Sequence, residues 1–177
     1  MILKKEFYFI RHGQTDHNIS AEEKIDLPAH ITLNSTGLTQ ANGIEPIIAS
    51  LPIKTVCCSP FKRAQETKDI VTSRLSAHHC EIEELGECSG LIWKEMTSLG
   101  TMAYLQAKDP VRKFMQQVLK GVNQALEQKG PVLIVAHGGV HWALCCFLGV
   151  ECEWVINNCV PVHFTVENEK WSARRLI

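Results

Sequence analysis

The stretch Phe7-Tyr8-Phe9-Ile10-Arg11-His12-Gly13-Gln14-Thr15 indicates the fold class of this 177-residue chain. It opens with aromatic and aliphatic residues, which favour a pleated, buried strand. It then changes at once to a charged pair and a glycine, which lets the backbone turn and lie close to a ligand. We therefore expect Arg11 and His12 at the C-terminal end of a strand, the position at which open α/β sheets bind ligands.

The composition of the chain is that of an ordinary globular protein. Hydrophobic residues make up 45% of it, which argues against disorder, and 177 residues suffice for one domain, 1–177. The formal net charge of −1 lacks the basic excess of a dedicated nucleic-acid binder, so we expect no nucleic-acid partner. No apolar run approaches the ~20 residues of a membrane span. Residues 1–6 also lack the regions of a signal peptide, so we expect a cytoplasmic protein without a membrane partner.

The eight cysteines form no C-x-x-C pair and so carry no local signature of zinc or thioredoxin-like chemistry. Several lie in apolar company, as in Thr55-Val56-Cys57-Cys58. We interpret them as small buried hydrophobic residues in a reducing compartment.

Hydrophobic periodicity and turn residues predict an order of strands and helices that is typical of one α/β sandwich. The polar residues from Ile19 to Leu33 predict a loop across the site, and the turn at 34–37 leads into a helix interrupted by Pro46. Ser59 and Pro60 predict an N-cap and a first helical position. Strands are predicted at 7–10, 53–58, 81–84, 132–136, 160–167 and 170–177, and helices at 38–51, 60–75, 93–107, 111–128 and 140–148.

Three strand-to-turn junctions carry basic residues. The first holds Arg11 and His12, the second is followed by Arg63, and the third holds His137 before two glycines. If these strands are parallel neighbours, the four side chains converge at one sheet edge, together with two helix N-termini. Such a pocket suits a dianionic phosphate, because guanidinium groups match phosphate oxygens in a planar fork. A neutral imidazole can attack phosphorus and leave again, and the arginines can stabilise the charge without a metal.

Four blocks in the right order make the sequence resemble the histidine phosphatase superfamily, in the branch of cofactor-dependent phosphoglycerate mutase and its phosphatase relatives. The resemblance extends to Asn158-Cys159-Val160 and Trp171, so it covers nearly the whole chain. The blocks are Arg11-His12-Gly13-Gln14-Thr15-Asp16-His17-Asn18, residues 33–41, residues 59–67 and Val135-Ala136-His137-Gly138-Gly139.

The resemblance implies a role for each matched residue. His12 would become a phosphohistidine, and Arg11, Arg63 and His137 would form the phosphate pocket. Asn18 matches an additional phosphate contact of the family, and the backbone of Gly138 would contribute as well. The implied fold is a three-layer αβα sandwich around a mainly parallel sheet, and the reaction needs no metal and no organic cofactor.

The proton donor is a separate question, because the leaving alkoxide needs an acid nearby. Family phosphatases place a Glu in a Leu-x-Glu pattern with a Trp six residues beyond it, which Leu85, Glu87 and Trp93 match without a gap. Leu91 departs from the pattern, since a glycine is common there, and Glu95 is shifted from the usual Trp-Glu-Gly. Glu83 and Glu84 are competitors of Glu87. If all three carboxylates are solvated, the enzyme would favour good leaving groups.

A phosphomonoesterase acting on a small phosphorylated metabolite is the leading hypothesis, because the region 85–90 lacks the basic pair of authentic mutases. The alternatives are a phosphohistidine-protein phosphatase and a catalytically weak phospho-ligand binding module. His17 is close enough to line the rim of the site. Lys24, Lys62 and Lys94 are candidates to meet a second anionic group, and Trp93, Met96, Met102 and Tyr104 are candidates to line the pocket. Nothing in the sequence indicates the oligomeric state.

Overall fold

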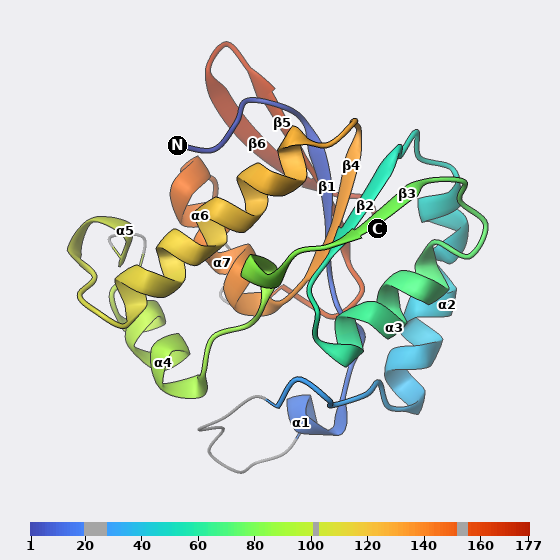
Figure 1. Cartoon of the computed structure of the whole chain (residues 1–177), viewed down its shortest axis with the longest axis horizontal. Helices are drawn as coiled ribbons and strands as arrows, with labels where there is room; N and C mark the ends of the chain where they lie inside the picture. Colours follow the sequence, from blue (N-terminus) through green and yellow to red (C-terminus); the bar gives the residue numbers. More distant parts are fainter. Residues whose placement is uncertain (20–27, 101–102, 152–155) are drawn as a thin grey trace.

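The computed structural model describes residues 1–19, 28–100, 103–151 and 156–177, which carry one six-stranded sheet (Figure 1). The strand order is β3-β2-β4-β1-β5-β6. The central strands β2, β4 and β1 pair in parallel, as do β2 and β3, whereas β5 runs antiparallel to β1 and to β6. The strands are β1 (Phe7–Arg11), β2 (Thr55–Cys58), β3 (His78–Glu81), β4 (Val132–Ala136), β5 (Pro161–Glu167) and β6 (Lys170–Arg175).

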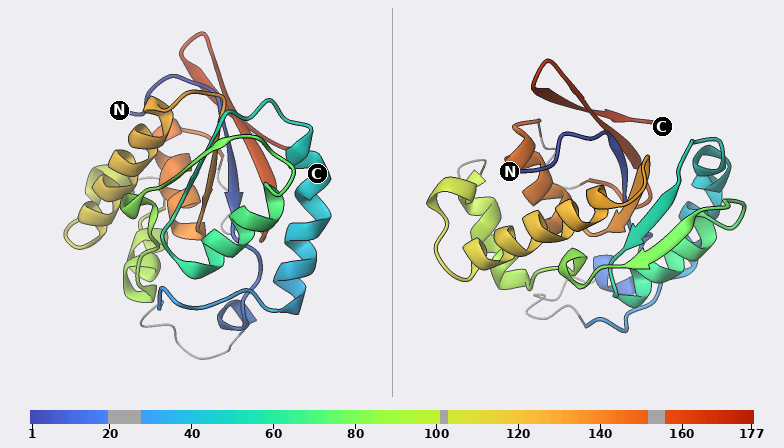
Figure 2. Two further views of the ribbon diagram at one scale, coloured as in Figure 1. Left: turned by 45° about the vertical axis from the view of Figure 1, so that its right-hand side comes forward. Right: turned by 45° about the horizontal axis from the view of Figure 1, so that its top comes forward.

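Helices cover both faces of this sheet (Figures 1 and 2). Side chains alternate across a strand, so Phe7 and Phe9 of β1 pack with α6 and α7, whereas Tyr8 and Ile10 pack with α2 and α3. The three-layer αβα sandwich with a mainly parallel sheet is thus confirmed. The helices are α1 (Asp16–Ile19), α2 (Ser35–Ala49), α3 (Lys62–Val71), the 3₁₀ turn η1 (Glu83–Leu85), α4 (Gly90–Ser98), α5 (Ala103–Gln106), α6 (Val111–Glu127) and α7 (Gly138–Leu148).

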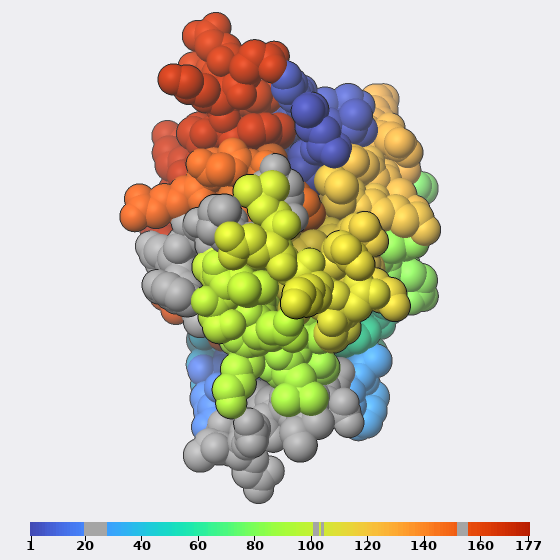
Figure 3. All heavy atoms as spheres, turned by 90° about the vertical axis from the view of Figure 1, so that its left-hand side faces the viewer, coloured from blue at the N-terminus to red at the C-terminus, as the bar shows by residue number. Residues whose placement is uncertain are grey.

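The long helices follow from local sequence signals. Asn34 caps α2 by accepting a hydrogen bond from the Gly37 amide at 2.9 Å. Pro46 lies inside α2, which continues to Ala49. One face of α6 is apolar and buried, including Phe114, Val118 and Val122, as its periodicity predicts. Figure 3 shows the side of the molecule on which α4 and α5 lie outermost.

Several predicted elements differ from the structure. The strand predicted at 81–84 is wrong, because β3 occupies His78–Glu81 and η1 follows it. β3 is an edge strand with mostly exposed side chains, so it has no hydrophobic alternation to detect. The single helix predicted at 93–107 is wrong as well. α4 ends at Ser98, Gly100 adopts a positive φ of 58°, and α5 begins at Ala103.

The predicted N-cap at Ser59 is also wrong. Phe61 precedes α3 as its N-cap residue and Lys62 begins the helix, so Pro60 lies outside it. The Ser59 hydroxyl instead accepts a hydrogen bond from the Phe61 amide and contacts His137, which holds it away from the amides of the helix. The helix α1 was not predicted, and α7 begins two residues earlier than predicted because both glycines after His137 are helical.

Two predictions about the chain as a whole can also be compared with the structure. In the four described ranges, no helix is both long and apolar enough to cross a membrane. The seven cysteines with described positions are free thiols, five of them buried. Cys152 lies outside the described residues.

Candidate active site

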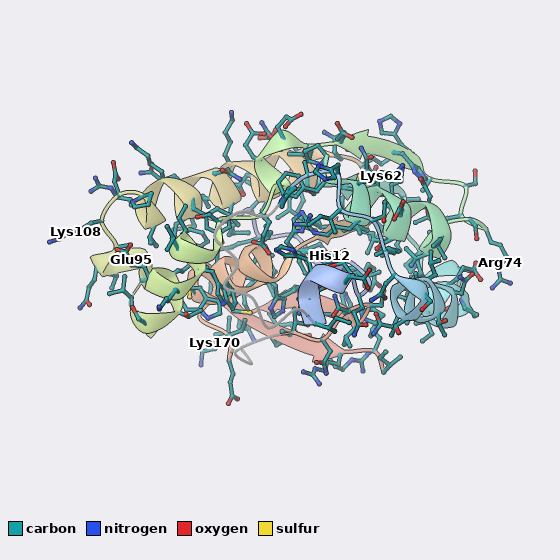
Figure 4. The ribbon with its side chains drawn as sticks, turned by 90° about the horizontal axis from the view of Figure 1, so that it is seen from below. His12, Lys62, Arg74, Glu95, Lys108 and Lys170 are labelled. Carbon is teal, nitrogen blue, oxygen red and sulfur yellow. The ribbon has the colours of Figure 1, made fainter. Side chains whose placement is uncertain are left out.

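The C-terminal ends of β1, β2 and β4 meet at one edge of the sheet, because these neighbouring strands are parallel and in the order β2-β4-β1. Arg11 ends β1 and His12 follows it, whereas His137 follows β4. α3 and α7 both begin at this edge, and Arg63 lies in the first turn of α3. Figure 4 views this end of the molecule, where His12 is central beside α1. The predicted convergence of the three junctions is therefore confirmed.

His12 is buried and held in one orientation. Its Nδ1 donates to the Gly13 carbonyl at 2.7 Å, which leaves Nε2 as the nitrogen with a free lone pair. That nitrogen accepts a hydrogen bond from Arg63 Nε at 3.1 Å. Burial, followed by the charges of Arg63 and Arg11, lowers the pKa of His12 well below its ordinary value. The lowered pKa favours a neutral ring at pH 7, and the unprotonated nitrogen of a neutral imidazole can act as a nucleophile.

Two arginines supply positive charge at this edge. Arg63 is buried, its Nη1 donates to the Pro28 carbonyl at 3.1 Å, and its guanidinium lies 4.9 Å above the Phe61 ring. Burial lowers the pKa of Arg63 to about 10, so it stays charged at neutral pH. Arg11 Nη1 donates to the Ile156 carbonyl at 2.7 Å. Its Nε is buried and has no hydrogen-bond partner among the described residues, so it remains a donor for an anion.

His137 is fully buried beside His12, with ring centroids 5.2 Å apart. Its Nε2 lies 2.7 Å from the hydroxyl of Ser59, and its Nδ1 has no partner among the described residues. Burial, then the charges of His12, Arg63 and Arg11, lowers the pKa of His137 well below its ordinary value. His137 is thus a neutral group packed against His12, although the residues that line the cavity do not include it.

Glu87 reaches the same place from the loop after η1. Its Oε2 accepts from the Gly139 amide and its Oε1 from the Cys88 amide, each at 3.1 Å. Burial raises the pKa of Glu87, and the two amides, Arg63 and Arg11 oppose this effect. A Cβ on Gly139 would lie 2.2 Å from Glu87 Oε1, so a larger residue at that position would displace the Glu87 carboxylate.

A cavity of about 220 Å³ opens beside these groups. Arg11, Arg63 and Glu87 line it together with His12, and apolar walls come from Ile31 and Trp93. Asn18, His17 and Gly138 also line it. The full lining is Arg11, His12, Thr15, His17, Asn18, Ile31, Arg63, Glu87, Cys88, Gly90, Trp93, Gly138 and Gly139.

Other predicted site residues do not meet the cavity. Glu83 is exposed, and Glu84 forms a 2.5 Å ion pair with Lys120, so neither competes with Glu87 by position. The prediction that Met96 lines the pocket is wrong, because α4 buries it in the core. Lys62 and Lys94 are exposed and do not line the cavity. Lys24, Met102 and the side chain of Tyr104 lie outside the described residues.

Three residues that sequence reasoning did not assign to the site support it from behind. Thr67 Oγ1 accepts from the Gly13 amide at 3.0 Å and donates to the Arg63 carbonyl at 2.7 Å. Asn158 Nδ2 donates to the His12 carbonyl at 2.7 Å. Ser59 is the third, through its contact with His137. All three lie within blocks that carry the family resemblance, which was the one signal available in the sequence.

The sequence comparisons agree with this arrangement. The family model of the histidine phosphatase superfamily, branch 1, matches residues 7–177. The uncharacterized phosphatase PhoE of Bacillus subtilis is 28% identical over 178 residues, which cover 93% of this chain and 90% of that protein. Agropine synthesis reductase of Rhizobium rhizogenes is 30% identical over 185 residues, or 96% of this chain, but the chain spans only 41% of its length.

Solved structures share the fold at low sequence identity. The α-ribazole phosphatase from Shigella flexneri has a TM-score of 0.69 and 19% identity, covering 97% of this chain and 96% of that chain. A mycobacterial glucosyl-3-phosphoglycerate phosphatase, in complex with VO3, has a TM-score of 0.66 and 18% identity, covering 98% of each chain. At these identities the likeness shows a shared fold. A phosphatase role is supported by the family match and by the phosphatase relative in Bacillus subtilis.

Proposed function

The chain belongs to the histidine phosphatase superfamily, and we propose that it is a metal-independent phosphomonoesterase that acts through a phosphohistidine on His12. One observation carries this proposal. The lone pair of a buried, neutral His12 lies 3.1 Å from a guanidinium nitrogen of Arg63 at the wall of a cavity. A nucleophile next to a permanent positive charge suits attack on an anionic phosphoryl group.

Several donors support binding of the phosphoryl oxygens. The buried Nε of Arg11 and Nδ1 of His137 have no hydrogen-bond partner among the described residues, and the guanidinium of Arg63 is already in place. The N-terminus of α7 contributes amide N–H groups and the positive end of its dipole, with Gly138 at the cavity. Asn18 faces the same space and is proposed as a further phosphate contact.

The proposed reaction has two steps. In the first, His12 Nε2 forms a bond to phosphorus while the ester P–O bond breaks, and Glu87 gives its proton to the leaving alkoxide. In the second, water attacks the phosphohistidine, Glu87 accepts a proton from it, and the P–N bond breaks to release inorganic phosphate. The raised pKa of Glu87 favours the protonated form that the first step needs.

The proposed substrate is a small phosphorylated metabolite. A cavity of about 220 Å³ holds a phosphoryl group and a leaving group of modest size. Beyond the charged groups, the lining combines the apolar side chains of Ile31, Cys88 and Trp93 with the polar Thr15, His17 and Asn18. The leaving group would therefore meet apolar as well as polar surface.

The test is phosphate release from a panel of small phosphomonoesters and a phosphohistidine peptide, with a metal chelator present. Native protein should hydrolyse alkyl phosphates, and His12→Ala should abolish this turnover. Activity on the phosphohistidine peptide alone would move the function to protein dephosphorylation. Retained phosphate binding without turnover of any substrate would favour a binding module and contradict the proposal.

A further inference from the structure

Ser59 lies at the end of β2, directly beside the active-site histidines, and the reaction described above does not use it. It is fully buried, and its hydroxyl lies 2.7 Å from His137 Nε2. The serine precedes α3 without capping it, because Phe61 is the N-cap residue of that helix. A buried hydroxyl in contact with a buried imidazole raises the question of which group donates the proton.

The surrounding hydrogen bonds indicate the direction. The Ser59 oxygen already accepts from the Phe61 amide at 3.2 Å, and among the described residues its hydroxyl proton is directed to His137 Nε2, at 2.7 Å. A buried hydroxyl proton needs an acceptor, which Nε2 of a neutral imidazole provides. His137 is neutral because it is buried next to Arg11, Arg63 and His12. If Nε2 accepts, the single ring proton is on Nδ1.

We infer that Ser59 is a positioning residue that sets the tautomer of His137, with the proton on Nδ1, where it donates to a phosphoryl oxygen. This inference rests on the proposed phosphatase function. Nδ1 is buried and has no partner in the described parts of the chain, and the centroid of the His137 ring lies 5.2 Å from that of His12, so a phosphoryl group on His12 would offer its hydrogen an acceptor. The opposite tautomer would present a lone pair to the phosphoryl oxygens and repel them.

The tautomer can be read directly by NMR of native protein labelled with ¹⁵N at histidine, because protonated and unprotonated ring nitrogens have well-separated chemical shifts. The His137 signals are assigned as those missing from His137→Asn. We expect a protonated Nδ1 and an unprotonated Nε2 in native protein, and a mixture of both tautomers in Ser59→Ala. A native His137 protonated on Nε2 would overturn the inference.

Kinetics and phosphate binding provide the second readout. Removing one hydrogen bond of about 1.4 kcal/mol corresponds to about a tenfold change, so Ser59→Ala should lower kcat and weaken inhibition by inorganic phosphate by about that factor. Ser59→Thr keeps the hydroxyl and should restore both. Thr55→Val is the matched control, because Thr55 is buried on the same strand and its hydroxyl donates to the Lys129 carbonyl at 2.8 Å, away from the site.

These outcomes separate the two proposals. If Ser59→Ala keeps native kcat and phosphate affinity, or if Thr55→Val loses as much as Ser59→Ala, the positioning role of Ser59 is wrong. If native protein hydrolyses no phosphomonoester, the proposed function fails. The NMR tautomer and the affinity for inorganic phosphate then still decide whether Ser59 orients His137 toward an anion.

Discussion

At the scale of single residues, the site depends on two histidines that burial keeps neutral. His12 and His137 are both buried, and the guanidinium groups of Arg11 and Arg63 oppose a further positive charge. The burial that keeps His12 neutral for its proposed role as a nucleophile also makes both rings costly to protonate. Catalytic competence and acid stability are therefore linked through the same side chains.

This linkage predicts a loss of stability in acid. Both folded-state pKa values lie well below the ordinary histidine value, so below about pH 6.5 the unfolded chain binds more protons than the native one. Each histidine then lowers the free energy of unfolding by up to about 1.4 kcal/mol for each unit by which the pH falls. Urea unfolding at pH 7.5 and pH 5.5 measures this loss of stability. His137→Asn should reduce the slope of the free energy of unfolding against pH. An unchanged slope in that variant would contradict the assignment of a neutral buried ring.

A second residue-scale prediction concerns Glu87. The leaving alkoxide needs the proton of Glu87, so Glu87→Gln should lower kcat for alkyl phosphates by about 10²–10⁴-fold. The effect on p-nitrophenyl phosphate should be small, because its leaving group departs without a proton. Since burial raises the pKa of Glu87, native activity should fall as the pH rises through that pKa, and the variant should lack this limb. Glu84→Gln is the control, because Glu84 pairs with Lys120 outside the cavity. Equal losses on both substrates would show that Glu87 is not the acid.

Sequence reasoning placed most of the candidate side chains at the cavity but missed their supports. Arg11, His12 and Arg63 follow from strand ends and helix starts, which are local signals. Ser59 has an equally strong local signal for an N-cap, yet its hydroxyl is held by His137, 78 residues away. Local sequence patterns cannot indicate a contact between residues so far apart in the chain. The hydrogen bond from Asn158 to the His12 carbonyl is a second contact of this kind.

At the scale of elements, α6 holds the turn that leads to Glu87. Gln117 on α6 donates to the carbonyls of Glu84 and Gly86, at 3.3 and 3.2 Å. Gly121 allows η1 to lie against the helix, because a Cβ there would come within 2.9 Å of Glu84. The position of Glu87, the proposed proton donor, therefore depends on a close approach between η1 and α6.

This close approach gives an element-scale prediction. Gly121→Ala forces η1 away from α6, so it should destabilise the protein by about 1–3 kcal/mol and lower kcat for alkyl phosphates. Gly43→Ala is the matched control in α2, where a Cβ meets nothing within 4 Å, and it should stabilise by about 0.4–1 kcal/mol. Chemical unfolding and phosphate release measure the two effects. The same gain in stability from both substitutions would contradict the role of Gly121.

Elements with a strong hydrophobic pattern of their own were predicted well, whereas the edge strand β3, which forms by pairing with its neighbour in the sheet, was not. α6 and β4 have continuous apolar patterns and lie where predicted. β3 forms because β2 offers it a parallel, in-register edge, with His78 to Glu81 opposite Thr55 to Cys58. Its own side chains are mostly exposed, so tertiary pairing rather than sequence pattern defines this strand.

At the scale of the whole molecule, the strand order creates the site. Only because β4 lies between β1 and β2 do three junctions far apart in sequence meet at one edge. From the sequence alone this adjacency is a condition for the site, which the family resemblance supports. Single-sequence periodicity alone does not distinguish this order from other arrangements of the same strands.

An anion that binds the assembled site should therefore stabilise the entire fold. Vanadate or phosphate at 100 times its Kd raises the free energy of unfolding by about 2.7 kcal/mol, because the unfolded chain has no such site. Arg63→Met should abolish the shift in Tm. Arg74→Met should retain it, since Arg74 is exposed and pairs with Glu45 at the periphery (Figure 4). If the anion still raised the Tm of Arg63→Met, it would bind at a site other than this cavity.

The most direct test of the proposed chemistry is to trap the phosphorylated enzyme. Native protein is mixed with a ³²P-labelled phosphomonoester that it hydrolyses, and the reaction is quenched in alkaline denaturant within milliseconds. The protein is then digested for mass spectrometry. We predict label that is stable in alkali and lost in acid, as for a phosphoramidate, on the peptide that contains His12, and its absence in His12→Ala. Label on any other residue, or turnover by His12→Ala at the native rate, would contradict His12 as the nucleophile.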